Sequence, residues 1–276
     1  MAIITPMLIV ASIGIVAGVM LALAAKFMAI TEDETFTGVR ELLPGVNCGA
    51  CGHSGCDGYA RQIVDADAPL NLCPPGGNQT ARAIGKLLGR DAGDVMETQA
   101  IVRCSRDCGR ANDIMEYQGT MSCESNNYFY QGRRSCSHAC LGFGDCVNAC
   151  QYGALRIRDG IAVVDPWACS GCGMCVARCP NALIKMVPKA SRVFVGCHSH
   201  DTGAFVRRLC PTGCIGCKRC EKECRFGAII VDRYLASVDP EKCTNCGDCV
   251  AVCPTKCIRT AGNLSEGNMS EGNKIS

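Results

Sequence analysis

The chain has 276 residues, of which 28 are basic and 26 acidic, and its formal net charge of +2 creates no field that would favour nucleic acid or an anionic surface. Aromatic residues make up only 5% of the sequence, which excludes large aromatic cores, whereas cysteine occurs 26 times. Disulfides or metal centres must therefore hold much of the chain together.

Residues 1–30 differ from all that follow, because no side chain from Ala2 to Ala25 is charged. Roughly 20 apolar residues span a bilayer, so the stretch predicts a transmembrane anchor that contacts lipid through residues 3–25. A cleaved signal peptide is the alternative, but no basic residue precedes Lys26. Lys26 and Arg40 follow the span, which predicts a single-pass protein of the cell (inner) membrane with its bulk on the cytoplasmic side. That compartment is reducing, so the cysteines are expected to be metal ligands.

Between the anchor and the first repeat lie two segments that contain cysteine. Residues 31–100 hold a compact cysteine unit with a predicted helix at "GYARQIVDA" (58–66) and a helix interrupted by glycines at "TARAIGKLLG" (80–89). Residues 101–135 form a connector that also contains cysteines. At the other end of the chain, residues 261–276 repeat Ser-Glu-Gly-Asn, which predicts a disordered tail.

Residues 136–190 and 210–260 repeat one pattern, with residues 191–209 as an insertion between them. "YGALRIRDGIAVVDPWAC" in the first matches "FGAIIVDRYLASVDPEKC" in the second. Each holds two β-branched runs around a turn, then Asp-Pro and the next cysteines. The pattern predicts one supersecondary unit, used twice.

The run "CSGCGMCVARCP" (169–180) places three cysteines on a tight turn and a fourth three residues later, before a proline. Four thiolates can also bind zinc, but zinc ribbons separate two CxxC pairs by a longer loop. In two-cluster ferredoxins, which carry this run, the fourth cysteine ligates the other cluster. Cys169, Cys172 and Cys175 are thus predicted to hold one cluster, and Cys179 its neighbour.

Residues 136–257 resemble tandem bacterial-type ferredoxin modules. The resemblance implies three complete ligand sets for 4Fe–4S clusters, each completed by the fourth cysteine of the neighbouring run. The sets are Cys214, Cys217, Cys220 and Cys253; Cys243, Cys246, Cys249 and Cys224; and Cys169, Cys172, Cys175 and Cys150.

A fourth set departs from the pattern, because "CLGFGDCVNAC" (140–150) has Phe143 where the second cysteine belongs. Phenylalanine cannot ligate iron. Cys136 is the nearest replacement, and it gives the set Cys136, Cys140, Cys146 and Cys179. A ligand from Cys123 and a three-iron cluster are the other possibilities.

The upstream unit, "LLPGVNCGACGHSGC" followed by Cys73, has the spacing Cys48-x2-Cys51-x4-Cys56-x16-Cys73. Together with the apolar N-terminus and the tandem modules, it resembles the long form of the B subunit of the Rnf complex, a membrane ferredoxin oxidoreductase that moves ions. The resemblance implies an α+β chain with five 4Fe–4S clusters, which carries electrons from soluble ferredoxin toward NAD or another acceptor. It also implies membrane partner subunits and an ion-translocating oxidoreductase of the translocase class. The residues themselves show no candidate nucleophile, acid–base pair or phosphate loop, so no catalytic pocket is expected in this chain.

Six cysteines remain outside these sets: Cys104, Cys108, Cys123, Cys197, Cys210 and Cys257. The first three could bind a sixth cluster with one more thiol, such as Cys136, or could be buried thiols that act as small hydrophobes. Cys197 and Cys210 bracket the insertion and could pair around a metal. Two alternatives to the Rnf hypothesis remain: a polyferredoxin subunit of a hydrogenase or formate dehydrogenase, and a non-redox zinc-binding structural protein.

Overall fold

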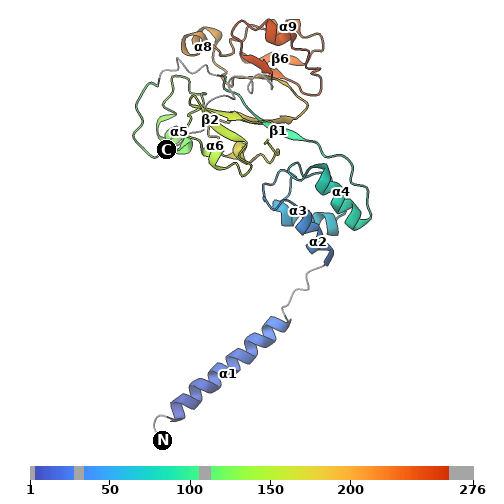
Figure 1. Cartoon of the computed structure of the whole chain (residues 1–276). Coiled ribbons are helices and arrows are strands. Elements are labelled where there is room, and N and C mark those ends of the chain that lie inside the picture. Colours follow the sequence, from blue (N-terminus) through green and yellow to red (C-terminus); the bar gives the residue numbers. More distant parts are fainter. Residues whose placement is uncertain (1–3, 28–33, 106–112, 261–276) are drawn as a thin grey trace, which may run out of the picture.

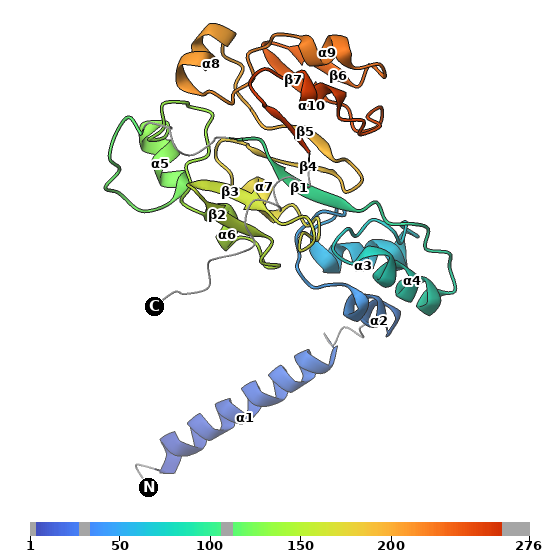
Figure 2. The ribbon, with the colours of Figure 1, turned by 45° about the horizontal axis from the view of Figure 1, so that its top comes forward.

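The computed structural model describes residues 4–27, 34–105 and 113–260 (Figure 1). Helix α1 (Ile4–Phe27) lies apart from the other elements in both views (Figures 1 and 2). Within the described part of the chain, no helix combines the length and the apolar character needed to cross a membrane. The predicted transmembrane anchor in residues 1–30 is therefore wrong.

Three helices form a small domain next: α2 (Glu34–Leu42), α3 (Gly55–Asp65) and α4 (Gly77–Leu88). Their inner faces share one apolar core around Val39, Ile63 and Ile84, none more than 2% exposed. Helix α4 ends at Gly89, whose φ of 66° is left-handed and reverses the chain. The two helices predicted in this part of the chain are thus present.

The first module is built from two antiparallel strand pairs. Strand β1 (Thr98–Val102) pairs with β4 (Ile184–Pro188), and β2 (Leu155–Arg158) pairs with β3 (Ile161–Val164). The turn of the β2–β3 hairpin is Asp159-Gly160, with φ values of 49° and 73°, as a two-residue turn between twisted strands requires. Short helices α6 (Asp145–Asn148) and α7 (Met174–Ala177) each follow a cysteine turn.

The second module repeats this arrangement. Strand β5 (Val193–Val195) pairs with β8 (Ile258–Thr260), and β6 (Ile229–Asp232) pairs with β7 (Leu235–Val238). Helices α9 (Arg219–Glu223) and α10 (Asp248–Ala251) take the places of α6 and α7. Each module has its own core of strand residues and cysteines.

In both modules, a helical segment separates the first strand from the first cysteine run. Helix α5 (Cys123–Tyr130) lies between β1 and the first run, and α8 (Gly203–Leu209) lies between β5 and its run. Each module thus begins with a strand, β1 or β5. This strand pairs with the last strand of the module, β4 or β8, which is distant in sequence (Figure 2).

Candidate metal centres

The loop between α2 and α3 and the segment before α4 bring four thiols together: Cys48, Cys51, Cys56 and Cys73. Gly49, Gly52 and Gly55 all have positive φ, so the loop closes tightly around the sulfurs. Burial, followed by the three neighbouring thiols, raises the pKa of Cys73 to about 11. The four cysteines that the sequence assigned to this unit therefore lie together.

Tyr59 fixes the chain next to Cys73. Its ring is 1% exposed, its hydroxyl donates to the carbonyl of Pro69 at 2.7 Å, and the amide of Leu72 donates to the hydroxyl at 3.2 Å. Burial raises the pKa of Tyr59 to about 12, so the phenol keeps its proton and can make both hydrogen bonds at neutral pH. The residue immediately before a candidate ligand is thus held by a buried side chain of α3.

In the second module, each run of cysteines is completed by the last cysteine of the other run. Burial and the thiols of Cys214, Cys217 and Cys253 raise the pKa of Cys220 to about 11. Burial and the thiols of Cys243, Cys246 and Cys224 raise that of Cys249 to the same value. One of these quartets, with Cys224, Cys243, Cys246 and Cys249, lines a cavity of about 20 Å³. Cys253 thus lies near the thiols of the first run, and Cys224 near those of the second.

The first module forms one quartet of the same kind. Burial, followed by the thiols of Cys169, Cys172 and Cys150, raises the pKa of Cys175 to about 11. Cys169 also accepts a hydrogen bond from the amide of Ala100 at 3.4 Å, which joins this quartet to strand β1.

The run that contains Phe143 lies next to Cys123, whereas Cys136 lines a different cavity. A cavity of about 20 Å³ is lined by Cys123, Cys140, Cys146 and Cys179. Burial and then the thiols of Cys140, Cys123 and Cys179 raise the pKa of Cys146 to about 12. The ring of Phe143 packs against Tyr117 and lies 4.6 Å from the guanidinium carbon of Arg133.

Asp145 holds Cys123 in this position. Its carboxylate accepts from the amide of Cys123 at 3.0 Å, from that of Glu124 at 3.1 Å, and from the hydroxyl of Ser122 at 3.0 Å. A carboxylate at a helix N-terminus satisfies amides that have no partner within the helix. Because Asp145 directly precedes Cys146, this cap brings the start of α5 to the quartet. No cysteine spacing signals such a contact between segments that are distant in the chain.

A backbone amide donates to the sulfur of the last cysteine in all four runs of the two modules. The pairs are Ala154 to Cys150, Leu183 to Cys179, Ala228 to Cys224 and Cys257 to Cys253, each at 3.3 Å. Such hydrogen bonds favour a thiolate and adjust the potential of a bound cluster. The same amide-to-sulfur hydrogen bond at four equivalent sites indicates that each of these sulfurs requires an amide donor.

These quartets fit four-iron clusters. Their cysteines form no disulfide, and the cysteines of two of the quartets line small cavities. Burial raises the pKa of at least one thiol in each quartet, so these thiols are protonated without metal, and the charge of bound iron would supply the free energy to deprotonate them. When bound, such a cluster supplies one-electron transfer at low potential. Across the described residues, no three His, Cys, Asp or Glu side chains are grouped closely enough for a single metal ion.

The fold and the thiol quartets define an electron-transfer protein of the ferredoxin class with multiple 4Fe–4S centres. Family models agree: an Fe–S cluster model matches residues 43–75, and two 4Fe–4S dicluster models match residues 134–180 and 213–257. The chain belongs to the family of B subunits of the ion-translocating Rnf oxidoreductase complex.

Three relatives carry this assignment. The B subunit of the ion-translocating oxidoreductase complex of Methanosarcina acetivorans is 43% identical over 91% of this chain and 95% of its own length. The B subunit of the Na⁺-translocating ferredoxin:NAD⁺ oxidoreductase complex of Acetobacterium woodii is 41% identical over 96% of this chain and 80% of its own length. The B subunit of the proton-translocating ferredoxin:NAD⁺ oxidoreductase complex of Clostridium ljungdahlii is 38% identical over 90% of this chain and 88% of its own length.

The structure also gives positions for the other cysteines that the sequence left unassigned, except Cys108. Cys108 and the predicted tail, residues 261–276, lie outside the described residues. Cys136 lies with Cys104, Cys197 and Cys210 around a separate cavity. Cys257 is 1% exposed, and its side chain makes hydrogen bonds with Cys197 and Cys214. These hydrogen bonds raise the pKa of Cys257 and lower the pKa of both Cys197 and Cys214 to about 6.

Proposed function

We propose that this chain is the component of a membrane-associated complex that takes electrons from reduced ferredoxin and passes them, through its 4Fe–4S centres, to partner subunits that reduce NAD or another acceptor. The observation that carries the proposal is the proximity of a first-module quartet to the quartet of the helical domain. Tyr152 of the first module lies beside Cys172 of its own quartet and beside Cys48 and Cys73 of the helical domain. A Cβ at Gly171 would lie 3.3 Å from Pro74 of that domain.

The proposed ligands form five sets. Four are those that the sequence predicted, and the fifth replaces Cys136 by Cys123, since Cys123 shares a cavity with Cys140, Cys146 and Cys179. The proposed domains are residues 31–100, with a single cluster, the connector at 101–135, and the modules at 136–190 and 210–260. Strands β1 and β5 extend each module upstream of these bounds.

The second module is the proposed docking site for soluble ferredoxin. Cys217 and Cys246, the second cysteines of its two runs, are exposed, whereas the equivalent Cys172 of the first module is 9% exposed. Ligands at the surface bring their clusters near a partner. Electrons would then cross the first module and leave through the helical domain. Because iron–thiolate ligation requires reduced cysteines, we place these domains on the cytoplasmic side of the cell membrane.

We assign ion translocation to the partner subunits, which makes this chain part of a translocase without an ion path of its own. A two-electron drop of ~100 mV releases about 4.7 kcal/mol, and moving one charge against ~100 mV costs about 2.3 kcal/mol. A modest potential difference can therefore drive one or two ions. The names of the relatives specify Na⁺ in one and protons in another, so family membership leaves the ion open.

The test is ferredoxin-driven NAD reduction by the purified complex with Cys214→Ala or Cys243→Ala in this chain. Both variants should lose most of the activity, because each removes a ligand of a second-module cluster. Met96→Ala is the matched control, since its side chain is 71% exposed. Unchanged electron transfer in both cysteine variants would rule out this route.

A further inference from the structure

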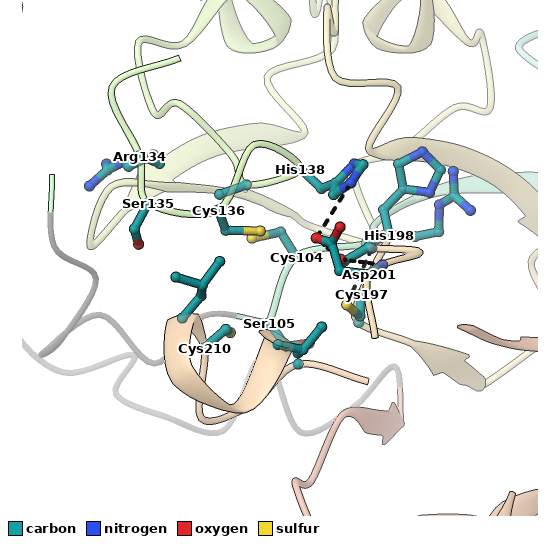
Figure 3. A pocket seen from close by; sticks show the side chains of 17 residues that line it. Cys104, Ser105, Arg134, Ser135, Cys136, His138, Cys197, His198, Asp201 and Cys210 are labelled. Atoms are coloured by element: carbon teal, nitrogen blue, oxygen red, sulfur yellow. Dashed lines mark hydrogen bonds and ion pairs between the residues drawn. The ribbon is translucent and has the colours of Figure 1, made fainter. Parts of the chain in front are cut away.

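Four cysteines outside the five sets surround the cavity between the two modules (Figure 3). They come from four separate segments: Cys104, Cys136, Cys197 and Cys210. Figure 3 shows the sulfurs of Cys104 and Cys136 directed at one another, with Cys197 and Cys210 at other sides of the cavity. Burial, followed by the thiols of Cys197, Cys104 and Cys210, raises the pKa of Cys136 to about 12, so all four sulfurs are neighbours.

The two modules contribute these cysteines from equivalent positions. Cys104 is the second residue after strand β1, and Cys197 is the second residue after strand β5. Cys136 precedes Cys140 by four residues, and Cys210 precedes Cys214 by four. Each module thus supplies one thiol after its first strand and one thiol before its first cysteine run. A repeated pair that meets its counterpart across an interface indicates a shared ligand site.

The backbone around the cavity holds the two halves together. The amide of Ser105 donates to the carbonyl of Gly196 at 2.8 Å, and the carbonyl of Ser105 accepts from Arg259 at 2.7 Å and from Thr212 at 3.1 Å. A side chain at position 196 would collide with Ser105, so the close approach of these loops requires glycine. The segments that carry Cys104 and Cys197 are therefore fixed to each other.

The cavity is larger than a single ion needs. Its volume is about 40 Å³, against about 20 Å³ for each of the two cavities lined by module quartets. A single water requires roughly 10–15 Å³ on this measure, so the space fits an occupant with several atoms. The charge also fits, because the guanidinium of Arg103 lies beside Cys197 and Cys179 and can offset the negative charge of thiolate-ligated iron.

We propose that Cys104, Cys136, Cys197 and Cys210 bind a sixth 4Fe–4S cluster that transfers electrons between the two modules. The inference rests on the proposed function and adds a centre to it. On one side Cys104 neighbours Cys140 of the first module. On the other side Cys197 neighbours Cys214 of the second, with Cys257 in contact with both. A cluster held by these four cysteines would supply one-electron transfer between the adjacent centres, with no bond formed or broken.

The first experiment measures iron, acid-labile sulfide and zinc in the full chain, purified anaerobically. Six cubanes predict about 24 iron atoms per chain at four per cluster. The double variant Cys136→Ser/Cys197→Ser should retain about 20, and Cys108→Ser should retain all of them. An unchanged iron content in the double variant, the loss of zinc in place of iron, or the loss of four iron atoms in Cys108→Ser would each overturn the ligand assignment.

A second measurement needs no variant, in case the double substitution disturbs folding. In the unaltered chain, the four thiols should resist alkylation until iron is removed with a chelator, and should then react together. Reaction of any of the four before iron removal would contradict the proposal.

Electron transfer separates the two proposals. In the purified complex the double variant should lose most of its ferredoxin-driven NAD reduction. Full activity with a full iron content would refute the sixth cluster and leave the proposed function intact. Absence of ferredoxin-driven reduction in the unaltered complex would instead refute the proposed function.

Discussion

Replacing Tyr59 by phenylalanine should loosen the cluster of the helical domain without touching a ligand. The substitution removes a hydroxyl that is paired with the carbonyl of Pro69 and the amide of Leu72, in a side chain only 1% exposed. Leaving a buried group unsatisfied costs about 1–3 kcal/mol. If that cost falls on the closed form of the segment before Cys73, its open population rises roughly 5- to 150-fold.

The assay is iron release from the full chain to a chelator, followed over time under anaerobic conditions. When the segment recloses faster than the chelator reacts, the rate follows the open population. One phase, with an amplitude of about four iron atoms, should therefore accelerate roughly 5- to 150-fold, while the remaining iron leaves at the rate of the unaltered chain. Tyr234→Phe is the control, since Tyr234 is 51% exposed. Equal rates in Tyr59→Phe and the unaltered chain, or acceleration of all the iron, would refute the reasoning.

Three further predictions address the fold, the pH dependence and the exchange of ligands. Gly171→Ala should destabilise the first module more than Gly173→Ala. Both glycines have positive φ, but only at position 171 would a Cβ lie 2.6 Å from the hydroxyl and 2.7 Å from the carbonyl oxygen of Thr98. Equal melting temperatures of the two variants would argue against this contact. The folded pKa of Tyr59, about 12, exceeds its ordinary value of 10.0, so its contribution to stability is complete below pH 10 and is lost as the pH rises toward 12. Iron release should accelerate in that range in the unaltered chain and less in Tyr59→Phe, and parallel profiles would contradict the assignment. Cys224→Ser should alter the EPR signal of the cluster held by the second run of its module, and a change confined to the first run's cluster would exclude the exchange.

Local spacing was sufficient to predict the elements and ligands that lie close together in the chain. The two β-branched runs after Cys150 form the β2–β3 hairpin, and those after Cys224 form β6–β7. The helix predicted at 58–66 is the main part of α3. In these segments the turn residues, the periodicity and the cysteine spacing all agree on one structure.

Long-range pairing was beyond the sequence pattern. Strand β1 pairs with β4 across a register that joins Thr98 to Pro188, and no local signal marks either as a partner of the other. Cys123 reaches its quartet because Asp145 caps α5, a contact between side chains that are far apart in sequence. Cys136 was the nearest replacement by spacing, but the fold directs it to the cavity between the modules.

The junctions between quartets bear on how electrons move through the chain. If the proposed sixth cluster is present, Cys104 interacts electrostatically with Cys140 of the first module and Cys197 with Cys214 of the second. Like charges inside a protein repel one another even at an effective dielectric constant of about 20. An electron on one centre therefore makes reduction of its neighbour less favourable, which opposes the filling of adjacent centres. The arrangement favours single electrons moving stepwise, and the guanidinium of Arg103, which interacts electrostatically with Cys197 and Cys179, lowers the cost of negative charge near both thiols.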